Sequence, residues 1–110
     1  MVSQEIIQKA IEILRSEPHG LEIDLLQWKE RIDEVQSNGD FLDISSLIRD
    51  LAALKTRKKK LSQIQDHALN NLEDRLIGEW AASLGSETKA IRPMLLACLR
   101  ESTAYLQNAG

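Results

Sequence analysis

The residues best suited to chemistry in this chain are a run of basic side chains. Lys55, Arg57, Lys58, Lys59 and Lys60 place five cations within six positions, out of fourteen Lys and Arg residues in all. Clustered cations contact the phosphates of nucleic acids, and their binding is sensitive to salt. The alternative is a solvated loop whose charges interact with the carbonyl end of a preceding helix. The absence of interleaved aromatic residues favours the solvated loop. We nevertheless keep all five residues as candidate nucleic-acid contacts.

The side chains that could act as nucleophiles or bind a metal are too few and too dispersed to predict catalysis. Cys98 is the only cysteine, and His19 and His67 are the only histidines. Their separations match no zinc-ligand spacing, and no phosphate-binding loop or activated-serine motif accompanies them. The position of Cys98 between Leu95 and Leu99 is typical of a small buried thiol. We therefore expect no enzyme activity, no cofactor, no metal site and no small-molecule substrate.

The length and composition of the chain limit the classes of protein to which it can belong. The chain has 110 residues, 43% of them hydrophobic and 28% charged, which suits one globular domain over 1–110. A net charge of −3 argues against a surface that is basic throughout. The single cysteine fits a reducing compartment, and we recognise neither a signal peptide nor a membrane-spanning run. These features predict a cytoplasmic protein that does not bind membranes.

Apolar residues recur at helical spacing along nearly the whole chain, and capping residues divide the pattern into segments. The first helix is expected at about 3–16, ending before Pro18. Asp24 and Gln27 form a capping box that starts the second helix. Asn38–Gly39 ends that helix, and both residues tolerate the left-handed conformation of a C-terminal cap.

Three further helices follow these two. Asp40 caps a segment with an apolar stripe over 41–54, and Ser62 with Gln65 forms the clearest capping box in the chain. The helix that starts there ends at Leu84–Gly85. Each boundary rests on a residue type that satisfies the free backbone groups at a helix end.

The last helix contains a proline, which leaves its start open. Ser86 or Thr88 can begin it, and its apolar side includes Met94. Pro93 then either occupies the first position of a helix that begins near Arg92, or kinks a helix that begins at Ser86. The pattern as a whole predicts an all-α fold, a compact bundle of about five short helices.

Two tryptophans lie on these apolar stripes. Trp28 shares a stripe with Leu25 and Ile32, which favours a core position; the alternative is an exposed wedge that inserts into the groove of bent DNA. Trp80 continues the stripe of Leu76. It belongs either to the core or to a partner-binding surface, where tryptophan is enriched.

Four short motifs follow one another from the second predicted helix onward. They read Asn38-Gly39-Asp40, Leu47-Ile48-Arg49-Asp50-Leu51, Leu61-Ser62 and Gly78-Glu79-Trp80-Ala81. Their order and spacing resemble the C-terminal helical domain of the CarD/CdnL family of bacterial RNA-polymerase-binding transcription regulators. In that family the motifs read S-G-D, V-V-R-D-L, L-S and G-E-L-A. The match from Gly39 to Ala81 needs no gap.

The resemblance implies a helical domain that contacts promoter DNA at the upstream edge of the melted region. In the family an N-terminal Tudor-like domain binds the polymerase β subunit, and we expect this chain to lack that domain. The segment Trp28-Lys29-Glu30-Arg31 resembles the tryptophan motif that the family wedges into the minor groove. The resemblance therefore makes Trp28 a candidate DNA contact.

The chain departs from the family on the helix after the L-S motif. Positions that are often basic there read Gln65, Asp66, His67, Asn71 and Glu73, which removes positive charge where phosphate contacts would form. One hypothesis is a transcription-linked module that binds a protein, RNA polymerase or another, and DNA phosphates. The alternative is a protein–protein adaptor that kept the fold and lost the DNA, with Trp80 as a candidate contact.

Overall fold

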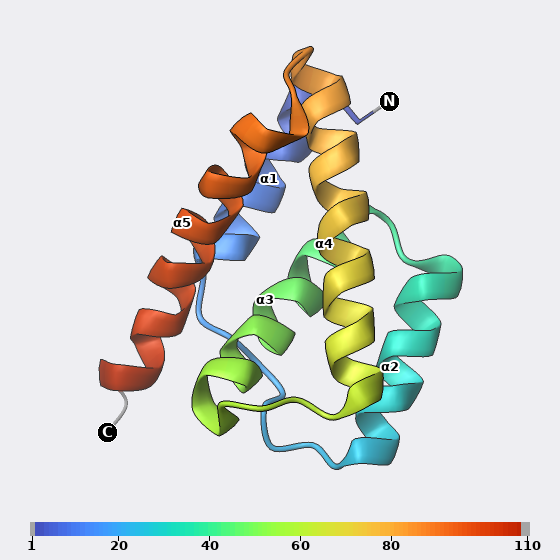
Figure 1. The fold of residues 1–110 in the computed structure, drawn as a ribbon, viewed down its shortest axis with the longest axis vertical. Coiled ribbons are helices and arrows are strands. Elements are labelled where there is room, and N and C mark those ends of the chain that lie inside the picture. Colours follow the sequence, from blue (N-terminus) through green and yellow to red (C-terminus); the bar gives the residue numbers. More distant parts are fainter. Residues whose placement is uncertain (1, 109–110) are drawn as a thin grey trace.

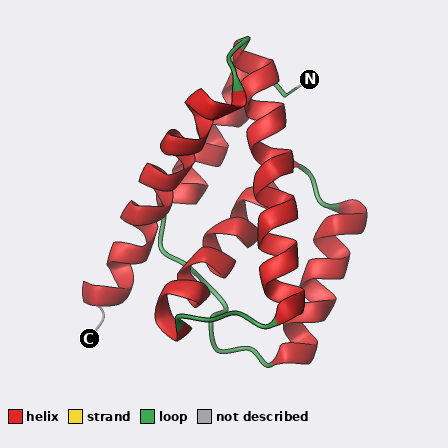
Figure 2. Ribbon diagram, viewed as in Figure 1, coloured by secondary structure: helices red, strands yellow, loops and turns green. Residues whose placement is uncertain are grey.

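The computed structural model describes residues 2–108, which fold into five α-helices without a strand (Figure 1). Loops join the helices, and the longest of them covers residues 16–24 (Figure 2). The all-α prediction is confirmed. Residues 1, 109 and 110 of the predicted domain lie outside the described residues. The helices are α1 (Gln4–Arg15), α2 (Leu25–Asn38), α3 (Phe41–Lys58), α4 (Gln63–Leu84) and α5 (Thr88–Asn108).

The helix starts follow the capping residues in the sequence. Asp24, Asp40 and Ser62 each cap a helix with a complete capping box, in which the cap and the third helical residue exchange hydrogen bonds. The hydroxyl of Ser3 accepts a hydrogen bond from the Ile6 amide at 3.2 Å and starts α1. Side-chain oxygens thus satisfy amide groups that a helix start leaves free. The predicted starts at Asp24 and Ser62 are confirmed.

Gly39 ends α2 in a way that the sequence analysis did not expect. Its φ is −71°, so the left-handed cap predicted there is wrong. A Cβ atom at this position would lie 2.5 Å from the carbonyl oxygen of Val35, which is closer than real contacts allow. Glycine is therefore needed here for close approach to the preceding turn, and the chain passes directly to the cap of α3 at Asp40. At the end of α4, by contrast, Gly85 does adopt the left-handed conformation, with φ 65°.

Pro93 lies inside α5 and matches neither predicted alternative in full. The helix begins at Thr88, so Pro93 is not at its first position, and Ser86 lies outside the helix. Because proline has no N–H, the carbonyl group of Lys89 loses its usual helical donor. Lys89 and Pro93 are both exposed, which leaves that carbonyl open to water.

α3 forms the centre of the domain and packs against each of the other four helices. Its large apolar side chains Ile44, Leu47, Ile48, Leu51 and Leu54 are completely buried. They belong to one hydrophobic core to which all five helices contribute. α2 packs only against α3 and α4, at the right-hand edge of the view in Figure 1.

Leu25 and Met94, which were assigned to apolar stripes, are exposed in the structure, and so is Ile64 near the start of α4. Leu25 is 54% exposed, Ile64 46% and Met94 44%. Leu25 and Ile64 occupy the first two positions of their helices, and Met94 lies in the second turn of α5. Periodicity identifies which side of a helix is apolar, but it does not show how far a neighbouring helix covers that side.

Candidate nucleic-acid interface

The basic residues of the sequence gather where α3 ends, and we call Lys55, Arg57, Lys58, Lys59 and Lys60 the basic end. The first three lie in the last turn of α3, Lys59 closes the helix with a left-handed φ of 64°, and Lys60 leads into the loop before α4. All five residues are exposed. The Lys59 amide donates to the carbonyl of Lys55 at 2.7 Å. Cations are stabilised here by the free carbonyl groups of the helix end.

Most of these cations have no acidic partner. The Lys55 ammonium lies 3.9 Å from the carboxylate of Asp66 at the start of α4, and both side chains are about half exposed. Within the part of the chain that the structure describes, no carboxylate lies within 4.0 Å of Arg57, Lys58, Lys59 or Lys60. Four charges are therefore free to meet an external anion.

The basic end surrounds the tip of α3 and does not form a single stripe. Lys55 lines a groove between α3, α4 and α5, whereas Arg57 lines a hollow beside residues 17–23 and Tyr105. This divergence follows from helix geometry, since two residues along an α-helix correspond to roughly 200° of rotation. An elongated anion that contacts several of these cations would have to run across the tip of the helix.

Trp28, which was predicted to lie in the core with a DNA wedge as the alternative, is buried in the core. Its residue is 1% exposed, and the Arg31 guanidinium lies 5.5 Å from the centre of its ring. The ring could insert into DNA only by leaving the core, so we do not retain it as a DNA contact. The core position that the sequence favoured agrees with its burial. Its indole N–H is buried without a hydrogen-bond partner among the described residues.

Trp80, the candidate partner contact, is also buried. It is 1% exposed and belongs to the same hydrophobic core as Leu76 and Ile77. A residue in this position supports the shape of the domain from within. We therefore place no partner contact at Trp80.

The start of α4 adds no cation to the basic end. Gln65 is buried and serves the capping box of Ser62. Asp66 pairs with Lys55, and His67 lines a hollow between α2 and α4 that also contains Ile64. These residues make the first turns of α4 neutral to acidic, as their sequence indicated.

An ion network that the sequence analysis missed lies beneath the surface of α3. Asp50 is 0% exposed, and its carboxylate accepts hydrogen bonds from Arg31 at 2.6 Å and from Arg49 at 2.9 Å. The backbone N–H of His19 donates to the same carboxylate at 2.8 Å. Two guanidinium groups and an amide thus compensate one buried negative charge. Two adjacent opposite charges inside the apolar stripe over 41–54 were the signal that could have revealed it.

Arg49 extends this network to the first and last helices. Its guanidinium donates to the Ser16 hydroxyl at 2.9 Å, just after the end of α1. The carbonyl of Ser16 accepts a hydrogen bond at 2.6 Å from the buried hydroxyl of Ser102 in α5. The network therefore connects α1, α2, α3 and α5 through groups that are largely removed from water.

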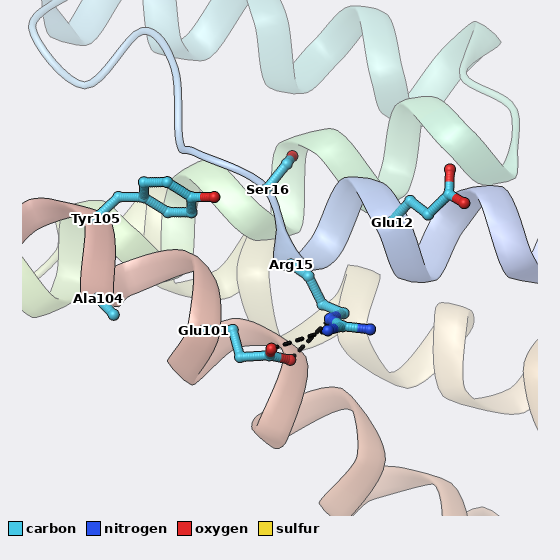
Figure 3. A pocket seen from close by; sticks show the side chains of 6 residues that line it. All are labelled: Glu12, Arg15, Ser16, Glu101, Ala104 and Tyr105. Carbon is cyan, nitrogen blue, oxygen red and sulfur yellow. Dashed lines mark hydrogen bonds and ion pairs between the residues drawn. The ribbon is translucent and has the colours of Figure 1, made fainter.

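A hollow of about 660 Å³ lies between α1 and α5. Figure 3 shows an ion pair in it, with Glu12 and Tyr105 to either side. Arg15 and Glu101 form that pair with two contacts, at 2.8 and 3.0 Å. Because these central charges satisfy each other, they leave no strong demand for an external ion.

The groups considered for catalysis are not assembled into a site. Cys98 is buried, and burial raises the pKa of its thiol, with the nearby Glu101 carboxylate adding to the effect. A higher pKa disfavours the nucleophilic thiolate. No group of three or more His, Cys, Asp or Glu residues suited to a metal ion occurs within residues 2–108. None of the described helices has the length and apolar character needed to cross a membrane.

The fold and its surfaces define an all-helical domain organised around a buried ion network, with a cluster of free cations at one helix end. The chain matches the family described as CarD, C-terminal domain, over residues 9–96, about four fifths of its length. It therefore belongs to the CarD C-terminal domain family, a transcription-associated family of regulatory, non-enzymatic domains. Comparisons with curated proteins and with solved structures gave no match.

Proposed function

We propose that this domain is a non-enzymatic, transcription-linked binding module whose basic end contacts the phosphate backbone of DNA. A protein, RNA polymerase or one associated with it, is the expected second partner. The observation that supports the DNA contact is the set of four exposed cations, Arg57 to Lys60, that have no carboxylate within 4.0 Å among the described residues. Family membership supports the link to transcription.

The acidic balance of the chain does not prevent such a contact. The net charge is −3, but salt screens charges beyond roughly 10 Å at 0.1 M ionic strength. A phosphate at the tip of α3 therefore interacts mainly with the local cations. The expected binding is independent of base sequence, because Lys and Arg contacts to phosphates position a protein without identifying bases.

The test reverses charges at the basic end and measures binding to a fluorescein-labelled duplex by anisotropy over a range of salt concentrations. The variant is R57E/K58E/K60E. Lys55 stays because of its ion pair with Asp66, and Lys59 because of its left-handed backbone. The slope of log K against log salt changes by about 0.9 per phosphate contact. If each cation neutralises one phosphate, we expect the slope to become shallower by roughly 2.7 and binding at low salt to be lost.

A matched variant separates a local contact from the change in net charge. K9E/R75E/K89E makes the same change in charge at three exposed positions outside the basic end. We expect this control to retain most of the affinity and most of the salt slope. Equal losses in both variants, or no loss in R57E/K58E/K60E, would exclude the basic end as the DNA contact.

The second candidate function is a protein–protein adaptor without DNA binding. The lack of cations at the start of α4 and the burial of Trp28 favour it. Purification of the tagged domain from its host, with and without nuclease, distinguishes the two. RNA polymerase that stays bound after nuclease treatment would support a direct protein contact. Polymerase that is lost on nuclease treatment would support a contact through DNA.

A further inference from the structure

A second surface, which we call the α3–α5 groove, lies between α3, α4 and α5. In Figure 1, α4 and α5 diverge toward the lower end of the molecule, with α3 between them. The groove has a volume of about 500 Å³, and six of its ten lining residues are polar or charged. The other four are apolar and come from all three helices: Ala52, Leu69, Leu96 and Leu99. Leu69 and Leu99 are buried, and Leu96 is 46% exposed. Both the size and the combination of apolar and polar lining residues occur in binding sites.

A carboxylate without a hydrogen-bond donor among the described residues lies in this lining. The Glu73 side chain is only 15% exposed, and the nearest guanidinium nitrogen, on Arg92 of α5, is 3.9 Å away. Arg92 instead donates a hydrogen bond to Asp74 at 3.0 Å. Among residues 2–108, no group donates a hydrogen bond to Glu73. The Glu73 oxygens are not among the fully buried atoms without a partner, so the donors that they lack among these residues come from water.

The charges around Glu73 come from all three helices of the groove. Burial raises the pKa of the Glu73 carboxyl, Arg92 and Lys55 lower it, and Asp74 raises it. The net effect is a raised pKa, so Arg92 and Lys55 do not fully compensate for the loss of water around the Glu73 carboxylate. This contrasts with the hollow between α1 and α5, where Arg15 and Glu101 satisfy each other at 2.8 Å.

We propose that the α3–α5 groove binds an amphipathic helix of a partner protein, which inserts a lysine or arginine side chain to pair with Glu73. The apolar stem of such a side chain fits among Leu69, Leu96 and Leu99, and its charged end meets the carboxylate. Exposed Lys55 and Arg100 line the groove, where they complement acidic residues flanking the inserted cation. The charged lining has both signs, with Glu73 opposite in charge to Lys55 and Arg100, which matches a peptide that carries both signs better than a uniformly negative nucleic acid. The proposal does not depend on DNA binding at the basic end.

The first experiment titrates the ¹⁵N-labelled full chain with n-butylammonium, which represents a lysine side chain. 1-Butanol is the uncharged control. We expect saturable amide shifts confined to residues 52–56, 69–73 and 96–103, with binding at least about 5-fold tighter for the ammonium than for the alcohol. Glu73→Gln removes that difference, and Glu87→Gln at an exposed position retains it. Equal binding of the two probes, or a difference that survives Glu73→Gln, overturns the proposal.

A second experiment tests the helical partner. Two amphipathic peptides are compared that differ only in a central lysine or norleucine, each with leucines one turn to either side and acidic residues beyond. We expect the lysine peptide to bind at least about 10-fold more tightly and to lower the pKa of Glu73, measured by ¹³C NMR. Equal affinities, or no binding by either peptide, overturn the assignment.

The labelled duplex is expected to leave the groove amides unshifted, and shifts there would indicate a nucleic-acid site instead. R57E/K58E/K60E should keep peptide binding, so failure of this site is distinguishable from failure of the DNA contact.

Discussion

Replacing Asp50 by Asn tests whether the buried ion network holds the domain together. The carboxylate is completely buried and accepts hydrogen bonds from Arg31 at 2.6 Å and from Arg49 at 2.9 Å. Asparagine keeps the size of the side chain but removes its charge. Arg49, which is 7% exposed, would then lack its counterion. Removing one partner of a buried ion pair costs about 3–5 kcal/mol.

The expected loss is large compared with the total stability of a small domain, which is about 5–15 kcal/mol. For a chain of this length, 1 kcal/mol corresponds to about 4 °C in the melting temperature. We therefore expect Asp50→Asn to lower the melting temperature by roughly 12–20 °C. Urea unfolding followed by circular dichroism at 222 nm, combined with a thermal scan, measures both quantities.

The matched control is Asp74→Asn, which makes the same chemical change in an exposed ion pair. Asp74 pairs with Arg92 at 3.0 Å, and its side chain is 72% exposed. Exposed pairs contribute at most about 1 kcal/mol. If Asp50→Asn destabilised the domain no more than Asp74→Asn does, the network would not have the role inferred from its burial and distances.

Two further predictions concern stability. Gly39→Ala should destabilise the domain by about 1–3 kcal/mol in urea unfolding, because the new Cβ would lie 2.5 Å from the Val35 oxygen. Gly78→Ala should stabilise the domain, because no atom lies within 4 Å of its Cβ. Equal effects of the two variants would contradict the close-approach explanation. The pKa of Glu73 is raised in the folded state, so at a pH just above the ordinary pKa of 4.5 the folded state binds more protons than the unfolded state. The contribution of this residue to the free energy of unfolding is therefore lost as the pH rises. Glu73→Gln should therefore gain stability relative to the unmodified chain between pH 4 and 8, and a difference that does not vary with pH would argue against a buried carboxylate.

The helix boundaries were largely predictable because they depend on local backbone chemistry. The boxes at Asp24 and Ser62 were recognised from two residues each, and both appear in the structure with reciprocal hydrogen bonds. Gly39 was correctly placed at a helix end for the wrong reason. Its conformation depends on the distance to Val35, which a turn rule based on residue type cannot supply.

The candidate site was less predictable, since burial and charge pairing arise from tertiary packing. Periodicity placed Trp28 on an apolar stripe, but only packing shows that the residue is 1% exposed. The cations from Lys55 to Lys60 were recognisable as a cluster, whereas the weak pairing of Lys55 with Asp66 depends on how α4 lies beside α3. The long distance from the Glu73 carboxylate to its nearest guanidinium could not be predicted from the sequence either, because that group, Arg92, lies on another helix.

The buried ion network limits what membership of this family says about the function of the chain. Arg49 and Asp50 lie within the segment 9–96 that matches the family, and they are only 7% and 0% exposed. Gly39 and Ser62, also within that segment, serve the ends of helices. These positions support the architecture of the domain. A family match that includes such buried positions therefore reports a shared architecture, and it does not by itself identify the partner that the surface of the domain binds.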